Sequence, residues 1–417
     1  MIPLDEAQRF VRAGLSALSP IALALDEALG CVVSEELVAK EPVPRFSNSA
    51  MDGYALRSID TKQATVRLHV VGSILTGEVS GLHLERGQTV RIMTGGLLPD
   101  GADCVCKMEE VTIDPGGRVV QIDRAISRGE HVRHPGEDVA VGQVLLTPGC
   151  ELGPLQIGLL ASQGCTSVIV HPRPRVGVLS TGSELVDFSD PLVGGKIRDT
   201  NRPMLLATLR RSGFTPVDLG SVKDDASAIA GKLQQGVQEC DAVISTGGVS
   251  VGDADFVKTV LLELCGEAAR SMQVAIKPGK PFAFGVAGPR KTPVFGLAGN
   301  PVSNLVGFEL LVRPALRLLA GHQTLERPTL NAVLDCPLPR RRDGKLHLIY
   351  VTARFHEDGR LHVRSAVRQG SHLLSGVANG NAIVMVADGD GFEVGEVVPT
   401  VILDSEQWPL GPASTAP

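Results

Sequence analysis

The chain has 417 residues, of which 43% are hydrophobic and 21% are charged. This composition predicts a globular protein, and a chain of this length is expected to fold as several domains. The net charge of −6 at pH 7 comes from lysines, arginines and acids spread along the chain. There is no basic stripe of the kind that binds nucleic acid, so we expect no nucleic-acid partner.

The sequence also argues against export and against a membrane partner. No apolar run is long enough to span a bilayer, and the N-terminus mixes acids and arginine with a helical apolar period. Eight cysteines are scattered, and the only close pair, Cys104 and Cys106, lacks the C-x-x-C spacing of zinc and redox sites. We therefore expect a cytoplasmic protein with reduced thiols.

The first part of the chain reads as a helical linker domain interrupted by a β-rich one. An apolar period predicts a helix over residues 4–18, and a second short helix is expected to end near Gly30. A further helix is predicted from Pro154 to just before Gly164. We assign residues 1–45 and 139–172 to this discontinuous N-terminal domain, and the alternating residues 46–138 to the β-rich domain.

The second half predicts two more domains. From residue 173 to 323, strand and helix patterns alternate, which indicates a parallel α/β sheet covered on both faces. Residues 324–408 form short strands, including a hairpin over 355–363, and are expected to form a small β barrel. The tail, 409–417, is expected to be disordered. The fold class is thus multidomain, α/β plus β.

Loops after the strands of a parallel sheet are where such a domain binds its ligand. In STGSEL, residues 180–185, Thr181 and Gly182 can hold an anion on backbone N–H groups while Glu184 faces a metal or a ribose hydroxyl. An ordinary helix N-cap explains the same residues. In DTN, Asp199 and Asn201 either contact a ligand or cap a helix.

The next loops add glycines and carboxylates. STGGVSVGDADF, residues 245–256, offers close approach at Gly247 and Gly248 and a donor at Ser250. Its two aspartates, Asp253 and Asp255, can cap the next helix, but carboxylates beside an anion loop favour a Mg²⁺ ion between the charges. Before another helix, Asp224 and Asp225 stand together, so that one can serve as the cap and leave the other free.

A stiff segment, KPGKP at residues 277–281, carries two point charges. Lys277 and Lys280 suit an oxyanion, and Pro278 fixes the backbone between them. Asn300 and Pro301 open a helix whose first N–H groups also favour anions. There is no P-loop, no G-x-G-x-x-G after a strand and no serine–histidine–aspartate set. Spacing alone predicts a Mg²⁺-dependent enzyme acting on a nucleotide-like anion.

One stretch outside the α/β domain narrows this further. VPRFSNSAMDGYAL, residues 43–56, resembles the signature of the molybdopterin molybdotransferase family, which includes the bacterial enzyme and the related region of gephyrin. TGSEL, DTN, TGGVSVGDADF, KPGKP and GLAGNPVSN resemble the same family in the same order. The resemblance implies an elongated four-part homodimer with shared active sites and a molybdopterin adenylyltransferase as upstream partner. It also implies the reaction: adenylylated molybdopterin and molybdate give molybdenum cofactor and AMP, with Mg²⁺.

The resemblance also implies roles for individual residues. The Mg²⁺ and pyrophosphate region takes Glu184, Asp224, Asp253 and Asp255. Asp52 resembles the carboxylate that the partner subunit brings to the site. The residues that the resemblance implies for binding molybdate are Lys277, Lys280, Ser303, Arg354 and Ser371. Thr94 and Asp138 match further family positions.

Three alternatives stay open at this point. The α/β domain is shared with enzymes that adenylylate molybdopterin, although the DGYA signature favours metal insertion. The chain can also be a scaffold that has lost catalysis, or a paralogue that handles tungsten. Ser183 stands where the family often has a second acid, which leaves the number of metal-ligating carboxylates open.

Overall fold

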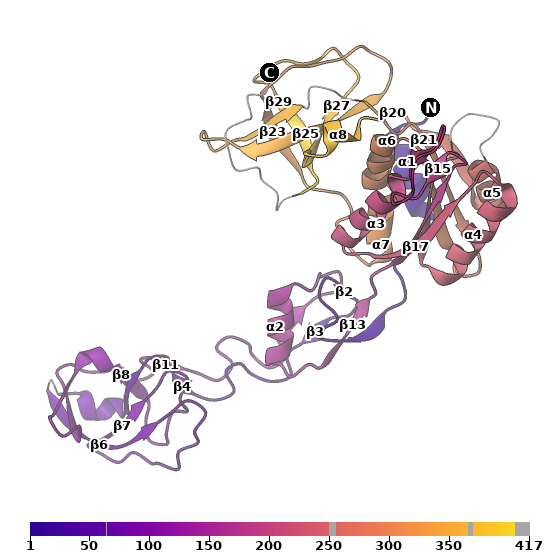
Figure 1. The fold of residues 1–417 in the computed structure, drawn as a ribbon. Helices are drawn as coiled ribbons and strands as arrows, with labels where there is room; N and C mark the ends of the chain where they lie inside the picture. Colours follow the sequence, from indigo (N-terminus) through magenta and orange to yellow (C-terminus); the bar gives the residue numbers. More distant parts are fainter. Residues whose placement is uncertain (64, 250–255, 366–369, 405–417) are drawn as a thin grey trace.

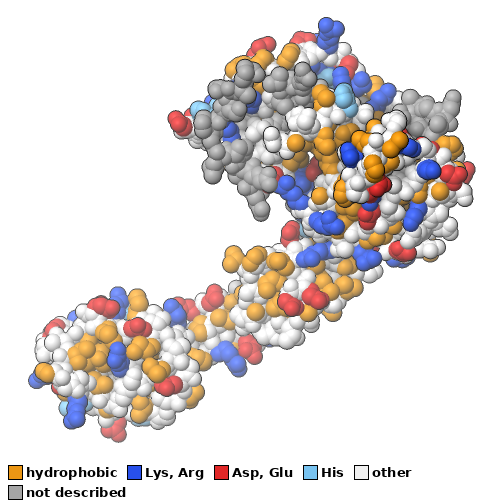
Figure 2. Space-filling view, in the orientation of Figure 1, with side chains coloured by type: hydrophobic (Ala, Val, Ile, Leu, Met, Phe, Trp, Pro, Cys, Tyr) orange, Lys and Arg blue, Asp and Glu red, His pale blue; other side chains and the backbone are white. Residues whose placement is uncertain are grey.

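The structure, a computed structural model, describes residues 1–63, 65–249, 256–365 and 370–404. They form an elongated molecule with a β-rich unit at one end, a narrow linker unit in the middle, and an α/β unit and a β barrel together at the other end (Figure 1). On the face seen in Figure 2, acidic and basic side chains mix on every unit. Within the described ranges, no helix is both long and apolar enough to cross a membrane.

The linker unit is built from two separate stretches of chain. Its elements are β1 (Ile21–Ala24), β2 (Val32–Val33), β3 (Leu37–Val38), β12 (Val144–Leu146), α2 (Pro154–Ser162) and β13 (Ser167–His171). The predicted helix at residues 154–164 is confirmed by α2, which Gly164 follows with a φ of +69°. The short helix expected before Gly30 is wrong: residues 21–24 pair with β13 as a strand, so sheet pairing overrides the helical pattern.

The β-rich unit holds a six-stranded sheet in the order β8-β5-β7-β6-β10-β9. These strands are β5 (Gly53–Leu56), β6 (Val66–Ile74), β7 (Gln88–Ile92), β8 (Cys104–Lys107), β9 (Val111–Ile113) and β10 (Val119–Ile122). A second ladder joins β4 (Asn48–Ser49) to β11 (Val132–Arg133). The sheet buries its own apolar residues, including Tyr54, Leu56 and Leu68, so this unit has a core of its own.

The first helix, α1 (Leu4–Ala13), packs on the α/β unit and not in the linker where the sequence placed it. Ala7 and Val11 are buried in the α/β core, and the ring of Phe10 meets Phe284 edge-on at 5.9 Å between centroids. The physical reason is the amphipathic pattern that predicted the helix. Its apolar face needs a large apolar surface, and the α/β sheet supplies one.

The α/β sheet has the order β17-β14-β18-β22-β21-β19. The four strands that carry the predicted loops are parallel, as expected, whereas β21 runs antiparallel to both of its neighbours, β22 and β19, which the sequence pattern did not reveal. The strands are β14 (Arg175–Thr181), β17 (Thr215–Val222), β18 (Ala242–Thr246), β19 (Arg270–Gln273), β21 (Pro281–Ala287) and β22 (Thr292–Leu297). The helices are α3 (Asn201–Arg211), α4 (Ala226–Glu239), α5 (Phe256–Cys265), α6 (Pro301–Gly307) and α7 (Arg313–Leu319), with a π-helical turn, Phe308–Val312, between the last two.

The C-terminal unit is a closed barrel of five strands, because β25 pairs with both β26 and β27. Its elements are β23 (Thr329–Leu334), β24 (Leu338–Pro339), β25 (Leu346–Phe355), β26 (Leu361–Ser365), α8 (Leu374–Val377), β27 (Ala382–Val386), β28 (Gly391–Phe392) and β29 (Val397–Ile402). Leu348, Tyr350 and Ile383 share one apolar core with Phe282 and Phe295 of the α/β sheet. The barrel is therefore fixed against the α/β unit by a continuous core.

Candidate functional site

The carboxyl ends of β14 and β18 lie side by side, and glycines let the following loops come very close. Gly247 has a φ of +97°, and a Cβ there would lie 2.4 Å from the carbonyl oxygen of Thr181. Gly248 follows with a φ of +61°. Any other residue at position 247 would both strain the backbone and push the loops apart. The predicted close approach at these two glycines therefore has a local structural basis.

The hydroxyl of Thr246, at the end of β18, is shared by two buried amides. Asn201 Nδ2 and Asn304 Nδ2 each donate to Thr246 Oγ1 at 2.8 Å. Asn201 Nδ2 also donates to the carbonyl of Gly299 at 2.7 Å. Asn201 is the first residue of α3 and makes no cap, so its amide joins three loops of the site. The Oδ1 atoms of both asparagines are buried and have no hydrogen-bond partner among the residues that the structure describes.

Glu184 and Asp224 present carboxylates at the same end of the sheet. A turn and the short strand β15 (Leu185–Val186) follow β14, and no helix begins there, which rules out the capping explanation for Glu184. Asp225 caps α4, because Ala228 N–H donates to its Oδ1 at 2.7 Å. Asp224 stays exposed beside the site and accepts from Ser183 N–H at 2.8 Å. The prediction that one of the two aspartates caps the helix is confirmed at Asp225, whereas Asp224 caps no helix and is held by Ser183 instead of being free.

Asp199 is buried, and its carboxylate forms an ion pair with Arg202. The guanidinium of Arg202 contacts Asp199 at 3.0 Å, Asp187 at 2.7 Å and Asp218 at 2.6 Å. Asp187 Oδ1 also accepts from Ser189 N–H, which with the Arg202 contact lowers the pKa of Asp187. Asp199 therefore stabilises the start of α3 through Arg202.

Three predicted residues of the loop after β18, Ser250, Asp253 and Asp255, lie outside the described residues.

The KPGKP segment forms one wall of a cleft of about 1370 Å³ between the α/β unit and the barrel. Its strand β20 (Ile276–Lys277) pairs in parallel with β25, so that Lys277 stands beside His347. Gly279, with a φ of +100°, brings the turn against the carbonyl of Ser303 in α6. Lys277, Pro278, Lys280, Ser303 and Ser371 all line this cleft, so the structure brings these predicted residues together.

The opposite wall of the cleft is more basic than the sequence prediction proposed. Arg340, Arg341, Lys345 and Arg364 line it together with His347, and the only acid among the described lining residues is Asp343. Such a surface attracts anions because each charge adds to the potential inside a concave wall. The run PRRRDGK at residues 339–345 is the sequence signal that would have found this wall.

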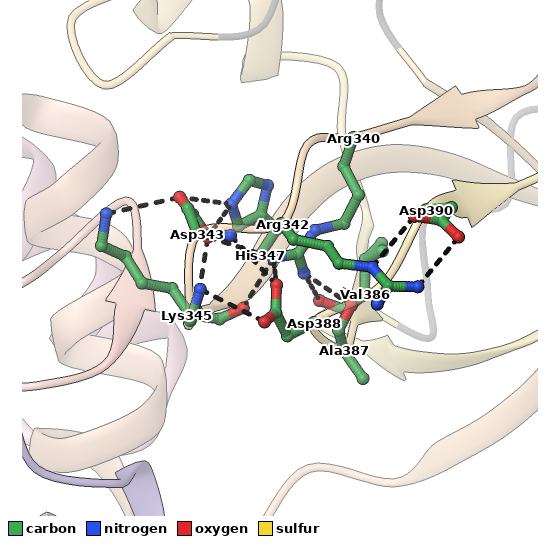
Figure 3. A network of polar contacts seen from close by, with 10 residues as sticks. Arg340, Arg342, Asp343, Lys345, His347, Val386, Ala387, Asp388 and Asp390 are labelled. Atoms are coloured by element: carbon green, nitrogen blue, oxygen red, sulfur yellow. Dashed lines mark hydrogen bonds and ion pairs between the residues drawn. The ribbon is translucent and has the colours of Figure 1, made fainter.

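The side chain of Arg340 is 1% exposed and is held by a polar network (Figure 3). It donates to Asp343 at 3.0 Å, to Asp388 at 2.6 Å and to the carbonyl of Val386 at 2.8 Å. Asp343 also contacts His347 and Lys345 at 3.1 and 3.3 Å. The hydrogen bond from His347 is the main reason that the pKa of Asp343 is lowered to about 2. The basic wall is therefore fixed in place by hydrogen bonds to Asp388 and to Asp343, whose carboxylate stays ionised.

The cleft and the loops of the α/β sheet form one continuous site. A Cβ on Gly299 would lie 3.7 Å from Gly247, and the next residue, Asn300, donates from Nδ2 to Ser371 Oγ at 3.2 Å. The carbonyl of Ser371 accepts from Val302 N–H at 3.1 Å. The glycine loops and the basic cleft are therefore neighbours that meet at Asn300 and Ser371.

Comparison with known proteins agrees with this architecture. The family model of the MoeA N-terminal region (domain I and II) matches residues 2–164, that of the probable molybdopterin binding domain matches 177–318, and that of the MoeA C-terminal region (domain IV) matches 331–403. The molybdopterin molybdenumtransferase of Haemophilus influenzae is 37% identical over 377 residues, which are 90% of this chain and 92% of that protein. This chain belongs to the molybdopterin molybdenumtransferase family.

Two further comparisons extend the match over almost the whole chain. The Bacillus subtilis molybdopterin molybdenumtransferase is 34% identical over 418 residues, covering 98% of this chain and 96% of that protein. The crystal structure of the molybdopterin biosynthesis moeA protein from Pyrococcus horikoshii OT3 superposes with a TM-score of 0.80 at 29% identity. The superposition covers 96% of this chain and 100% of the Pyrococcus horikoshii chain. The predicted family, an enzyme family, and the predicted fold class are confirmed.

In this member of the molybdopterin molybdenumtransferase family, three of the predicted site residues lie away from the cleft of their own chain. Asp52 and Thr94 are in the β-rich unit at the far end of the molecule (Figure 1). Thr94 donates to Asp52 Oδ1 from its N–H at 2.7 Å and from its hydroxyl at 2.8 Å, and the backbone bond is the larger cause of the lowered pKa of Asp52. Asp138 is exposed where the β-rich unit joins the linker, and its N–H donates to Val43.

The fourth displaced residue is Arg354. It is on β25, but it is not among the residues that line the cleft, and its guanidinium lies 3.7 Å from Asp335. The alternating direction of side chains along β25 explains this placement. Alternate residues of a strand point to opposite faces, and a barrel strand has only one end at the cleft.

Proposed function

We propose that this chain inserts molybdenum, supplied as molybdate, into adenylylated molybdopterin, with release of AMP and formation of molybdenum cofactor. The observation that carries the proposal is the basic cleft joined to the glycine loops of a molybdopterin-binding-type domain. The cleft offers charge for an oxyanion, and the loops offer backbone N–H groups for a phosphate. The two substrates would thus lie next to each other on one continuous surface.

The cleft suits a tetrahedral dianion such as molybdate. Lys277 and Lys280 approach from one wall, and Lys345 approaches from the other. The hydroxyls of Ser303 and Ser371 can donate hydrogen bonds between these charges. Tungstate has the same shape and charge, so we expect the cleft to bind it as well.

The glycine loops suit the pterin's pyrophosphate. Thr181, Gly182, Gly247 and Gly248 let a phosphate approach the backbone closely, and we assign Asn300 and Pro301 to its far side. Glu184 and Asp224 are exposed oxygen ligands at one end of the sheet, which is the donor set that Mg²⁺ prefers. When bound, Mg²⁺ would neutralise the charge that develops as the phosphoanhydride is cleaved. Asp253, Asp255 and Ser250 are proposed for the same region on the family resemblance alone.

The protein's own part in this chemistry is positioning and charge neutralisation. The two dithiolene sulfurs that bind molybdenum belong to the substrate, so no protein nucleophile is required. Lys277 would hold the incoming oxyanion, and the loop glycines would fix the phosphate that leaves with AMP. Asn201 supports this arrangement by joining Thr246 to the loop at Gly299.

We also propose a cytoplasmic homodimer in which Asp52 and Thr94 of one subunit complete the site of the other. Its support is the distance along the molecule between these residues and the cleft of the same chain (Figure 1). Asp138, near the same joint, is proposed as a further contact. The adenylylated substrate requires an adenylyltransferase as the preceding enzyme, and that enzyme is the proposed upstream partner.

The test is AMP release from purified adenylylated molybdopterin with Mg²⁺, measured with and without molybdate. We expect release that depends on molybdate and a product that activates an apo-molybdoenzyme. AMP release that ignores molybdate would refute metal insertion. Consumption of ATP and free molybdopterin would assign the chain to the preceding adenylylation step, and the absence of any turnover would favour a scaffold.

A further inference from the structure

Three metal-ligating side chains lie together on the β25–β26 hairpin of the barrel. His356 and Asp358 are in the exposed turn, and His362 is on β26. One ligand atom from each lies within 4.8 Å of the other two. The turn itself is well fixed, because Gly359 N–H donates to the carbonyl of His356 at 3.0 Å and Arg360 N–H donates to Asp358 Oδ1 at 2.9 Å.

A fourth residue, Asp335, orients one of the two imidazoles. His362 Nδ1 lies 2.7 Å from Asp335 Oδ1, and a carboxylate can only accept, so Nδ1 carries the proton. The other ring nitrogen, Nε2, is turned toward Asp358 Oδ2 at 3.2 Å. This is the arrangement in which a carboxylate behind a metal-binding histidine sets the tautomer of its ring. The guanidinium of Arg354 lies 3.7 Å from the same Asp335 carboxylate.

We propose that His356, Asp358 and His362 bind one Zn²⁺ ion, with water as the fourth ligand. In a tetrahedral site with bonds of ~2.0–2.1 Å, the ligand atoms lie roughly 3.3 Å apart. The contact between His362 and Asp358 already has this spacing, and the exposed side chain of His356 closes the remaining gap by rotation. Two imidazoles favour zinc and its neighbours over Mg²⁺, which prefers oxygen.

The site links the hairpin to the strand that leads into the basic cleft. Asp335 directly follows β23, and its N–H donates to the carbonyl of Val363 at 2.9 Å. The next residue, Cys336, lines the cleft. Bound zinc would therefore tie the barrel wall of the cleft to the hairpin and raise the Tm of the protein.

The experiment is isothermal titration of the full chain with Zn²⁺, with Co²⁺ absorption as a second probe. We expect one ion per chain for the wild type and a loss of affinity of at least tenfold in His356→Gln, Asp358→Asn and His362→Gln. His69→Gln removes an exposed histidine of the β-rich unit and is the matched control, which should bind like the wild type. The Co²⁺ spectrum should lack a thiolate band, which excludes binding by the eight cysteines.

Two outcomes would overturn the site. These are no binding at all, or equal binding by the wild type and the three ligand variants. Asp335→Asn tests the positioning role separately. The amide still accepts a hydrogen bond from His362 Nδ1, but the lost charge should lower zinc affinity about tenfold. A purely structural effect of Asp335→Asn would lower the Tm of the zinc-free protein and leave the zinc affinity unchanged.

Discussion

The hydroxyl of Thr246 is the point at which a small change should disturb the site most. Thr246→Val keeps the shape of the side chain but removes the acceptor shared by Asn201 and Asn304. Each amide keeps one other bond: Asn201 to Gly299 at 2.7 Å and Asn304 to Ala298 at 3.3 Å. An unpaired buried donor costs about 1–3 kcal/mol, and here two amides each lose one of their two hydrogen bonds. Thr246→Val should therefore lower the free energy of unfolding by about 2–3 kcal/mol.

This loss should appear in the α/β unit and not elsewhere. About 2–3 kcal/mol corresponds to a fall in Tm of roughly 4–12 °C for a domain of this size. Hydrogen–deuterium exchange should quicken in the peptides that contain β18, α3 and α6, since these elements share the hydroxyl. The β-rich unit has its own core, so its exchange should not change.

Thr292→Val is the matched control for this measurement. Thr292 is also buried in the α/β sheet, but its hydroxyl only donates to the carbonyl of Val237, at 3.3 Å. Its loss should cost less than Thr246→Val. If both variants lowered the Tm equally, or if exchange near β18 stayed at the wild-type rate, the shared hydroxyl would not be what holds the loops together.

Three further predictions concern the cleft, the dimer and pH. Lys277→Ala should raise the molybdate concentration for half-maximal AMP release at least tenfold, whereas Lys232→Ala on α4 should not; equal titrations would remove Lys277 from the oxyanion site. Coexpression of an Asp52→Asn chain with a Lys277→Ala chain should restore about a quarter of wild-type activity if each site uses two subunits, and none if it uses one. Burial, and then the charge of Arg317, lower the pKa of His322 to about 4, so the unfolded chain binds a proton that the folded chain excludes. The contribution of His322 to the free energy of unfolding should be full above pH 6.5 and fall toward pH 4, by up to about 3 kcal/mol. His322→Gln should remove this fall, as measured by urea unfolding at pH 6.5 and at pH 4. An unchanged dependence of the unfolding free energy on pH would contradict the prediction.

The sequence predicted best those features that depend on neighbouring residues. Of the pair Asp224 and Asp225, one was expected to cap the helix and Asp225 does so, because capping is decided within one turn of helix. Gly247 and Gly248 have positive φ, as the need for close approach requires. The turn of KPGKP likewise follows from its two prolines and its glycine, Gly279.

Features that depend on distant contacts could not be predicted in the same way. Asn201 was expected as a cap or a ligand contact, but its partners, Thr246 and Gly299, are 45 and 98 residues away. Arg340 is buried because Asp388, 48 residues later, folds back onto it. No local pattern encodes such a partner, so the basic wall of the cleft escaped the motif search.

The strand β20 explains why the two walls of the cleft can act together. It belongs to the α/β part of the chain, yet it pairs with β25 of the barrel, so Lys277 and His347 are held in one ladder. The ladder fixes the backbone of Lys277, and the carboxylate of Asp343, 3.1 Å from His347 Nε2, fixes that ring before any ligand arrives. An oxyanion entering the cleft therefore meets charges that need little reorganisation, which is the condition under which fixed charges bind and polarise a substrate most effectively. Loss of the β20–β25 pairing should consequently weaken oxyanion binding even where every lysine and arginine remains.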